Sequence, residues 1–213
     1  MQRLRITEVF YSLQGETRTV GLPTVFIRLT GCPLRCQYCD TAYAFQGGQW
    51  HDIPAILAEV KQYGAKYVTV TGGEPLAQKG CHDLLVSLCD EGYEVSLETS
   101  GAIDMSRVDK RVVKIMDIKT PGSGEVDRNL WSNVETLQPH DQVKFVICDQ
   151  ADYEWSKDII QQHGLLERGE VLFSPSYTQL KPGELGDWML KDRLSVRLQV
   201  QLHKYLWGDA PGR

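Results

Sequence analysis

The sequence from residue 24 to residue 41 reads T-V-F-I-R-L-T-G-C-P-L-R-C-Q-Y-C-D-T. Its first seven residues are mostly β-branched or apolar and predict a strand. The strand leads into a loop in which Gly31 and Pro33 favour turns. Three cysteines in this loop have the spacing C-x3-C-x2-C, and thiolates suit iron–sulfur clusters, zinc or copper(I). They are Cys32, Cys36 and Cys39.

The cysteine spacing leaves several interpretations open. Electron-transfer [4Fe–4S] clusters normally use four cysteines, so a cluster on three would keep one iron open for a small molecule. The three thiols could instead bind a structural zinc, with His51 or a distant residue as the fourth ligand. A disulfide framework is a further possibility, but six cysteines in a chain without a visible secretion signal favour a reducing compartment.

Length and composition predict an ordinary globular protein. The 213 residues suit a single domain spanning 1–213, with 42% hydrophobic and 24% charged residues. A net charge of -5 gives no reason to expect nucleic acid or an anionic membrane as a partner. No apolar run is long enough to span a bilayer, and the first residues lack a signal-peptide core. We therefore expect a cytoplasmic location.

Strand and helix patterns alternate along the chain. We expect strands at residues 24–30, 66–71, 93–98, 112–117, 142–147, 170–173 and 196–202. We expect helices at residues 53–63, 83–90, 152–162 and 184–194, with Asp52 as the N-cap of the first. This order predicts an α/β fold with six to seven largely parallel strands. The chain is too short for a complete eightfold barrel, so we expect an open, partial (βα) barrel with its site at the carboxyl ends of the strands.

Several polar segments fall at these strand ends or close to them. T-G-G-E-P at 71–75 combines glycines, which let backbone approach a ligand, with the acceptor Glu74. S-L-Q-G-E-T at 12–17 suits recognition of a heterocycle, and L-E-T-S-G at 97–101 ends a strand with a carboxylate and hydroxyls. Each could also be an ordinary turn. Arg28 is unexpected in an apolar strand unless it is paired, either with a ligand carboxylate or in a structural salt bridge.

The cysteine spacing resembles the signature of the radical S-adenosylmethionine (SAM) superfamily. With T-G-G-E-P, L-E-T-S-G, the run from Glu8 to Thr41 and the C-terminal Q-L-H-K-Y, most of the chain resembles the 7-carboxy-7-deazaguanine synthases of queuosine and deazapurine biosynthesis. The resemblance implies a radical SAM lyase that converts 6-carboxy-5,6,7,8-tetrahydropterin to 7-carboxy-7-deazaguanine with loss of ammonia. It also implies a [4Fe–4S] cluster, SAM, Mg²⁺, a homodimer and an electron donor such as flavodoxin. The alternatives are another radical SAM activity, such as a glycyl-radical activase, and a zinc-stabilised domain without enzymatic activity.

The resemblance assigns roles residue by residue. The cluster ligands are Cys32, Cys36 and Cys39, and the magnesium ligand is Thr41. The substrate-binding residues are Leu13, Gln14, Gly15, Glu16, Arg28 and Thr71. The SAM-binding residues are Tyr38, Cys39, Asp40, Gly73, Glu74, Thr99, Ser100, Asp117, Lys119, Ser174 and Tyr177.

Some segments depart from the family pattern or stay open. Around Asp117 and Lys119 the sequence reads M-D-I-K, where relatives often have S-P-K. His203 could face the site or cap the end of the last expected strand, and Arg213 could reach the site. The other cysteines are expected to be buried free thiols rather than ligands of a second cluster. They are Cys81, Cys89 and Cys148.

Overall fold

The computed structural model describes residues 3–208, 210 and 212, and this part of the chain contains a nine-stranded sheet. The strand order is β3-β1-β2-β4-β5-β6-β7-β8-β9, and all neighbours from β2 onward are parallel. β1 pairs antiparallel with β2 and with β3. The strands are β1 (Arg3–Leu13), β2 (Pro23–Leu29), β3 (Gln49–Asp52), β4 (Tyr67–Gly72), β5 (Glu94–Thr99), β6 (Val113–Ile118), β7 (Gln142–Ile147), β8 (Glu170–Pro175) and β9 (Arg197–Leu198).

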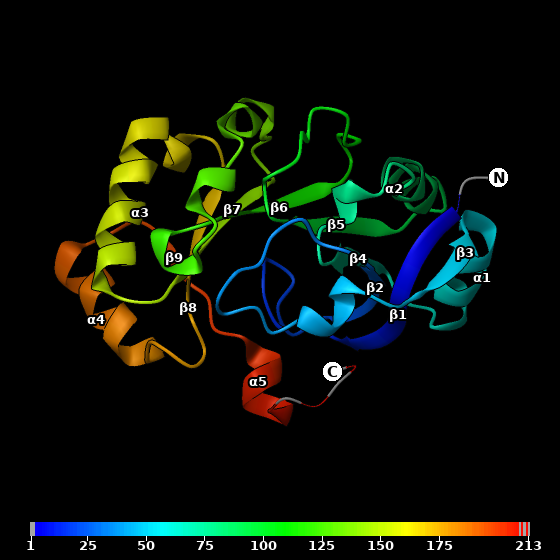
Figure 1. Cartoon of the computed structure of the whole chain (residues 1–213), viewed down its shortest axis with the longest axis horizontal. Helices are drawn as coiled ribbons and strands as arrows, with labels where there is room; N and C mark the ends of the chain where they lie inside the picture. Colours follow the sequence, from blue (N-terminus) through cyan, green and yellow to red (C-terminus); the bar gives the residue numbers. More distant parts are fainter. Residues whose placement is uncertain (1–2, 209, 211, 213) are drawn as a thin grey trace.

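Five α-helices are described, together with short 3-10 helices. They are α1 (Ile53–Gln62), α2 (Cys81–Asp90), α3 (Gln150–His163), α4 (Pro182–Asp192) and α5 (Leu202–Trp207). The 3-10 helices are η1 (Ala42–Phe45), η2 (Pro75–Ala77), η3 (Pro121–Ser123), η4 (Val126–Arg128), η5 (Trp131–Thr136) and η6 (Leu165–Glu167). Figure 1 shows α3 and α4 near one end of the sheet and α1 and α2 near the other.

Local signals explain where the longer helices begin and end. Asp52 accepts a hydrogen bond from the Ala55 N–H at 2.9 Å, which confirms it as the N-cap of α1. Asp149 caps α3 in the same way, through the Asp152 N–H at 2.9 Å. α3 ends at Gly164, whose φ of 58° lies in the left-handed region that glycine tolerates best. Among the described residues, no helix is both long and apolar enough to cross a membrane.

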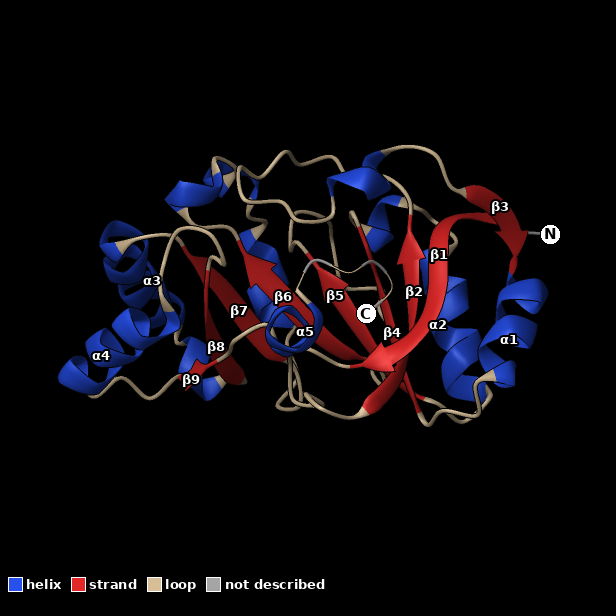
Figure 2. Cartoon of the chain, turned by 90° about the horizontal axis from the view of Figure 1, so that it is seen from below, coloured by secondary structure: helices blue, strands red, loops and turns tan. Residues whose placement is uncertain are grey.

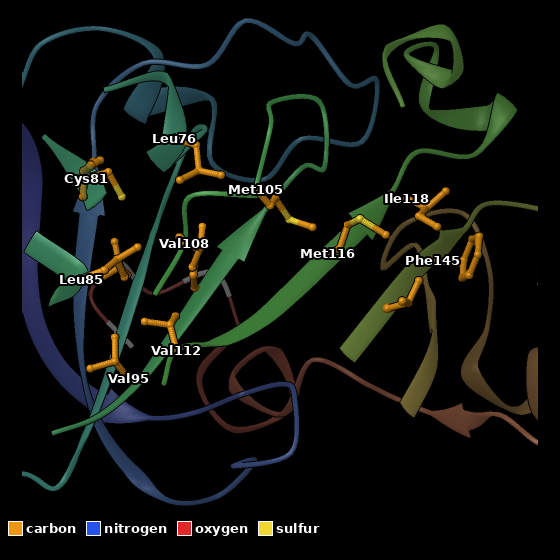
Figure 3. Close-up of a cluster of buried hydrophobic side chains, with 14 of the residues drawn as sticks. Leu76, Cys81, Leu85, Val95, Met105, Val108, Val112, Met116, Ile118 and Phe145 are labelled. Carbon is orange, nitrogen blue, oxygen red and sulfur yellow. The ribbon is translucent and has the colours of Figure 1, made fainter. Parts of the chain in front are cut away.

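The hydrophobic core lies between the sheet and the helices that cover it. Alternate residues of the parallel strands contribute Val95 from β5, Met116 and Ile118 from β6 and Phe145 from β7. Figure 3 shows these side chains along the sheet, with Leu85 of α2 near Val95. Because side chains alternate between the two faces of a strand, the residues between these core positions face the opposite side of the sheet. The core therefore leaves one face free for a polar cavity.

The structure confirms the open α/β architecture and corrects its two ends. β1 and β3 were not predicted, so the strand at 24–30 is the second in the chain rather than the first. The last strand, expected at 196–202, has only two residues. Gln201 is instead the N-cap residue of α5, which places His203 on a helix rather than at the end of a strand. The expected helix at 184–194 begins two residues earlier, at Pro182.

The sheet is not closed, and α5 lies near its open side. The Leu202 N–H donates to the Gly15 carbonyl at 2.9 Å, so α5 starts against the loop that joins β1 to β2. Figure 2 shows α5 in front of the parallel strands. This contact brings the loop after β1 and the C-terminal helix together at the polar face of the sheet.

Candidate active site

A cavity of about 530 Å³ occupies the polar face of the sheet. Register brings its lining side chains together: Arg28 on β2 pairs with Thr71 on β4, and Asp117 on β6 pairs with Lys144 on β7. Between them, Thr71 Oγ1 donates to Glu98 Oε2 of β5 at 2.9 Å. The parallel strands therefore present polar groups side by side in one cavity.

The cavity brings together nearly all the predicted site residues. They are Leu13, Gln14, Gly15, Glu16, Arg28, Cys32, Cys36, Tyr38, Cys39, Asp40, Thr41, Thr71, Gly73, Thr99, Ser100, Asp117, Lys119, Ser174 and Tyr177. His203 also lines it, whereas Arg213 lies outside the described residues.

Glu74 is the predicted residue that does not line the cavity. Its fully buried carboxylate accepts hydrogen bonds from the Leu76 N–H at 3.0 Å, the Thr99 hydroxyl at 2.9 Å and the Ser100 N–H at 2.7 Å. These donors come from the 3-10 helix after β4 and from the end of β5. In this structure Glu74 fixes Thr99 and Ser100, which themselves line the cavity, and its own contact with SAM stays a prediction.

The cysteine loop has the features that a three-cysteine cluster requires. All six cysteines of the chain are free thiols, which rules out the disulfide framework. Burial raises the pKa of Cys36 to about 11, and the nearby Lys119 ammonium acts in the opposite direction. Burial alone would lower the pKa of Lys119, but Asp117, 3.0 Å away, together with the Cys36 and Cys32 thiolates, outweighs burial and raises that pKa. A cation thus lies beside thiols that must become thiolates to bind metal.

The described residues do not assemble a site for a single zinc ion. Within the described part of the chain, no three His, Cys, Asp or Glu side chains are grouped so that they could hold one metal ion. A [4Fe–4S] cube takes one cysteine per iron, so its ligands surround a larger group. His51, the suggested fourth zinc ligand, is on the edge strand β3, opposite Leu4 of β1.

The loop after β1 lies across the cavity floor. Gln14 Nε2 donates to Thr69 Oγ1 at 3.1 Å and to Glu98 Oε1 at 3.4 Å. Glu16 Oε2 lies 2.6 Å from Lys144 Nζ. At Gly15, an added Cβ would lie 2.1 Å from Nδ1 of His203, so a side chain here would displace the His203 ring from its present position. The loop therefore presents one amide and one carboxylate to the cavity.

Arg28 is paired, but not through the whole guanidinium. Its Nε donates to Glu8 Oε1 at 2.7 Å, and Tyr43 OH donates to the same oxygen at 2.7 Å. The Arg28 guanidinium carbon lies 5.7 Å from the Phe10 ring centroid and 5.8 Å from that of Tyr43. Glu8 is thus the structural ion-pair partner that an arginine in an apolar strand requires. Glu8 and the two rings hold the Arg28 guanidinium at the cavity wall.

Asp40 and Thr41 follow the last cysteine of the loop. Thr41 Oγ1 donates to Asp40 Oδ1 at 2.7 Å, so these two oxygens are adjacent in the cavity wall. Gln201 Nε2 lies 3.3 Å from Asp40 Oδ2 and 3.0 Å from Glu16 Oε1. The N-terminus of α5 therefore connects this pair of oxygens to the loop that carries Gln14.

Several cavity residues were missed as site residues by the sequence reasoning, and three of them carry polar groups central to the site. Lys144, Glu98 and Gln201 all line the cavity. Lys144 had the same signal as Arg28, a cation within an apolar strand, Q-V-K-F-V-I. Burial alone would lower the pKa of Lys144, but the adjacent Glu16 and Asp117 raise it. Gln201 had no such signal, because its position depends on a helix that the sequence did not reveal.

Comparison with known proteins agrees with this geometry. The chain matches the radical SAM superfamily over residues 26–161. It is 46% identical to a 7-carboxy-7-deazaguanine synthase of Chlorobaculum tepidum, covering 98% of this chain and 97% of the relative. It is 41% identical to one of Koribacter versatilis, covering 96% of this chain and 97% of the relative. The fold is similar to that of QueE from Escherichia coli, with a TM-score of 0.78 at 22% identity over 93% of this chain and 94% of that one. The chain belongs to the radical SAM superfamily and, within it, to the 7-carboxy-7-deazaguanine synthases.

Proposed function

We propose that this enzyme converts 6-carboxy-5,6,7,8-tetrahydropterin to 7-carboxy-7-deazaguanine with loss of ammonia. The observation that carries the proposal is a single cavity in which the three-cysteine loop faces the loop of Gln14 and Glu16. A glycyl-radical activase would share the cysteines but would not need that loop. As a radical SAM enzyme, the chain uses a [4Fe–4S] cluster and SAM, which supply the one-electron chemistry of the ring contraction.

At the cofactor end, we assign the three cysteine thiolates as cluster ligands. Thr99 and Ser100, whose hydroxyls and Ser100 N–H donate to Glu74, keep their hydroxyl oxygens as acceptors toward SAM, together with the backbone of Gly73. Asp117 and Lys119 form an ion pair at the same wall. The remaining SAM-binding assignments are Tyr38, Cys39, Asp40, Ser174 and Tyr177, all of which line the cavity.

At the substrate end, the proposed contacts complement a pterin. The carboxylates of Glu16 and Glu98 can accept hydrogen bonds from the amino group and ring N–H groups, and the Gln14 side chain can donate and accept. Arg28 keeps its Nη groups for the substrate carboxylate while Glu8 holds its Nε. Leu13, Gly15 and Thr71 complete the proposed substrate wall.

Thr41 is the proposed magnesium ligand. Mg²⁺ prefers hard oxygen ligands and often takes only one or two from the protein, the rest coming from substrate and water. The adjacent Asp40 carboxylate supplies negative charge beside the Thr41 hydroxyl. This arrangement supports a magnesium ion between the protein and the pterin.

The remaining features of the proposal come from the family resemblance. We infer that the chain acts as one domain, because one sheet extends from β1 to β9. We further propose a homodimer in the cytoplasm, reduced by a flavodoxin-type donor, with no nucleic acid or membrane as partner. Sedimentation analysis of the cluster-loaded enzyme tests the dimer, and reduction by flavodoxin in place of dithionite tests the donor.

An anaerobic turnover assay tests the reaction. The reconstituted enzyme receives SAM, dithionite, Mg²⁺ and 6-carboxytetrahydropterin, and mass spectrometry follows 5′-deoxyadenosine and 7-carboxy-7-deazaguanine. We expect both products. Formation of 5′-deoxyadenosine alone would leave the radical SAM chemistry intact but show that the substrate is wrong.

Replacing a cluster cysteine tests the metal assignment. Cys36→Ala removes one thiolate ligand, so we expect loss of iron, acid-labile sulfide and turnover with little change in circular dichroism. Cys89→Ala, on α2 and away from the cavity, is the matched control and should retain all three. Turnover by the Cys36→Ala enzyme would contradict the cluster assignment.

A further inference from the structure

The loop that carries Gln14 and Glu16 spans the inside of the open barrel. It leaves β1 after Leu13 and returns to β2 at Pro23, where backbone hydrogen bonds hold its base, for example from the Gln14 N–H to the Leu22 carbonyl at 2.9 Å. It also contacts β4 and β5 through Gln14, and β7 through Glu16 and Arg18. In the sheet, β2 and β7 are separated by β4, β5 and β6. The loop therefore reaches across the concave face rather than along one strand.

Two contacts attach the loop to β7. Lys144 Nζ lies 2.6 Å from Glu16 Oε2, and the Arg18 N–H donates to Gln142 Oε1 at 2.9 Å. Lys144 is the charged member of this attachment, and its side chain is only 15% exposed. It also lies 3.6 Å from Asp117 Oδ2 on β6. A single ammonium group thus lies between the substrate loop and the cofactor end of the cavity.

The backbone between the two contacts adopts a rare conformation. Thr17, between Glu16 and Arg18, has φ at 64°, and its side chain is buried. A β-branched residue in the left-handed region is strained and persists only where the surrounding structure enforces the conformation. The flanking contacts to Lys144 and Gln142 provide that enforcement.

The Lys144 ammonium compensates the negative charge of nearby carboxylates. Glu16 and Glu98 face the same part of the cavity, and each of them acts on the pKa of Lys144. Removing one partner of a buried ion pair leaves the other charge uncompensated, which costs more than the pair itself contributes. Without Lys144, Glu16 would turn toward water or take up a proton, and the loop would lose its charged attachment to β7.

We propose that Lys144 is a positioning residue that holds Glu16 and the loop of residues 14–22 across the barrel, so that Gln14 and Glu16 face the substrate before it binds. Its effect on the loop is a property of this chain alone. Its effect on pterin affinity rests on the proposed function.

The chain contains a matched control for the loss of a buried lysine. Lys114 on β6 lies 2.9 Å from Asp141, and the two side chains are 3% and 0% exposed. Neither residue lines the cavity. Lys114→Met therefore removes a comparable buried ion pair without touching the loop, and any general loss of stability will appear in both variants.

The test compares Lys144→Met, Lys144→Arg and Lys114→Met as reconstituted holoenzymes. Hydrogen–deuterium exchange of peptides covering residues 14–22 reports the loop, and anaerobic calorimetry gives the affinities for SAM and 6-carboxytetrahydropterin. For Lys144→Met we expect faster exchange in this loop and pterin affinity weaker by about tenfold or more, the size of a lost charged hydrogen bond. SAM affinity should hold, because Asp117 keeps Lys119 at 3.0 Å. Lys144→Arg keeps a cation at this position and should retain much of the wild-type loop protection and pterin affinity.

The outcomes separate the two proposals. Unchanged loop exchange in Lys144→Met, or the same changes in Lys114→Met, would overturn the positioning role. If the wild-type enzyme neither binds nor converts the pterin, the proposed function fails, and loop exchange still decides the role of Lys144. If Lys144→Met does not fold, Glu16→Gln breaks the same pair from the loop side and gives the same exchange readout.

Discussion

Gly73 lacks a side chain because the cysteine loop occupies the space. An added Cβ would lie 2.4 Å from the Gly31 carbonyl oxygen and 2.7 Å from Cys32 Cβ. Both contacts are shorter than van der Waals packing allows, so Gly73→Ala must displace the loop that carries the cluster ligands. We expect less iron and sulfide after reconstitution and little product. Gly183→Ala, where an added Cβ meets nothing within 4 Å, is the control and should bind iron as the wild type does.

A single charged residue in an apolar strand was an informative sequence signal. It drew attention to Arg28, and the structure places Arg28 at the cavity wall with Glu8 as its partner. Lys144 carried the same signal in Q-V-K-F-V-I, but the reasoning did not apply it there. For Glu74 the sequence motif was recognised, but its hydrogen-bond partners were not. Only the structure shows that the Glu74 carboxylate accepts hydrogen bonds from Thr99 and Ser100.

At the scale of elements, α5 is held to the cavity by polar contacts rather than by a core. None of its residues is buried, and Gln201 at its N-cap donates to Glu16 Oε1 at 3.0 Å. We predict that Gln201→Ala weakens pterin affinity by about tenfold, the scale of one hydrogen bond to a charged group, with almost no change in Tm. Calorimetry and thermal unfolding measure the two quantities. A large fall in Tm without loss of affinity would show that α5 stabilises the fold instead.

The same weakness of packing explains why the sequence did not reveal α5. The six residues of α5 have no buried face that would give helical periodicity, whereas residues 196–202 alternate apolar and polar side chains, V-R-L-Q-V-Q-L, as a strand does. β3 is short and exposed at the sheet edge, which also hides its pattern. The inner parallel strands were predicted because their apolar residues pack against helices. β1 did carry a signal, since buried Leu4 and Ile6 alternate with exposed Arg3 and Arg5.

At the scale of the whole molecule, one face of the sheet forms the hydrophobic core and the other forms the site. The outer face buries apolar side chains under the helices, whereas the inner face carries the charged cavity. The order of strands and the carboxyl-end location of the site follow from the alternation of elements, so both could be predicted. Closure of the open side by the loop of residues 14–22 and by α5 could not, because it depends on contacts between distant polar residues such as Glu16 and Gln201.

This separation implies that the cavity is maintained at the expense of stability, and Glu98 provides the test. Burial raises the pKa of Glu98 and the nearby Glu16 raises it further, and these effects outweigh the opposing ones of Lys144, Thr71 and Arg28. A carboxyl whose pKa is higher in the folded state weakens folding above that pKa and has no such effect below the unfolded value, where both states hold the proton.

Glu98→Gln should therefore increase the free energy of unfolding near pH 7.5, and the gain should shrink as pH falls through the raised pKa. Turnover should fall at the same time, because a proposed acceptor for the pterin is lost. Urea unfolding at pH 7.5 and pH 5 measures the gain, with Glu184→Gln on the exposed face of α4 as the control. A Glu98→Gln enzyme that is less stable than the wild type at pH 7.5 would mean that the hydrogen bond from Thr71, 2.9 Å long, outweighs the cost of burying the charge.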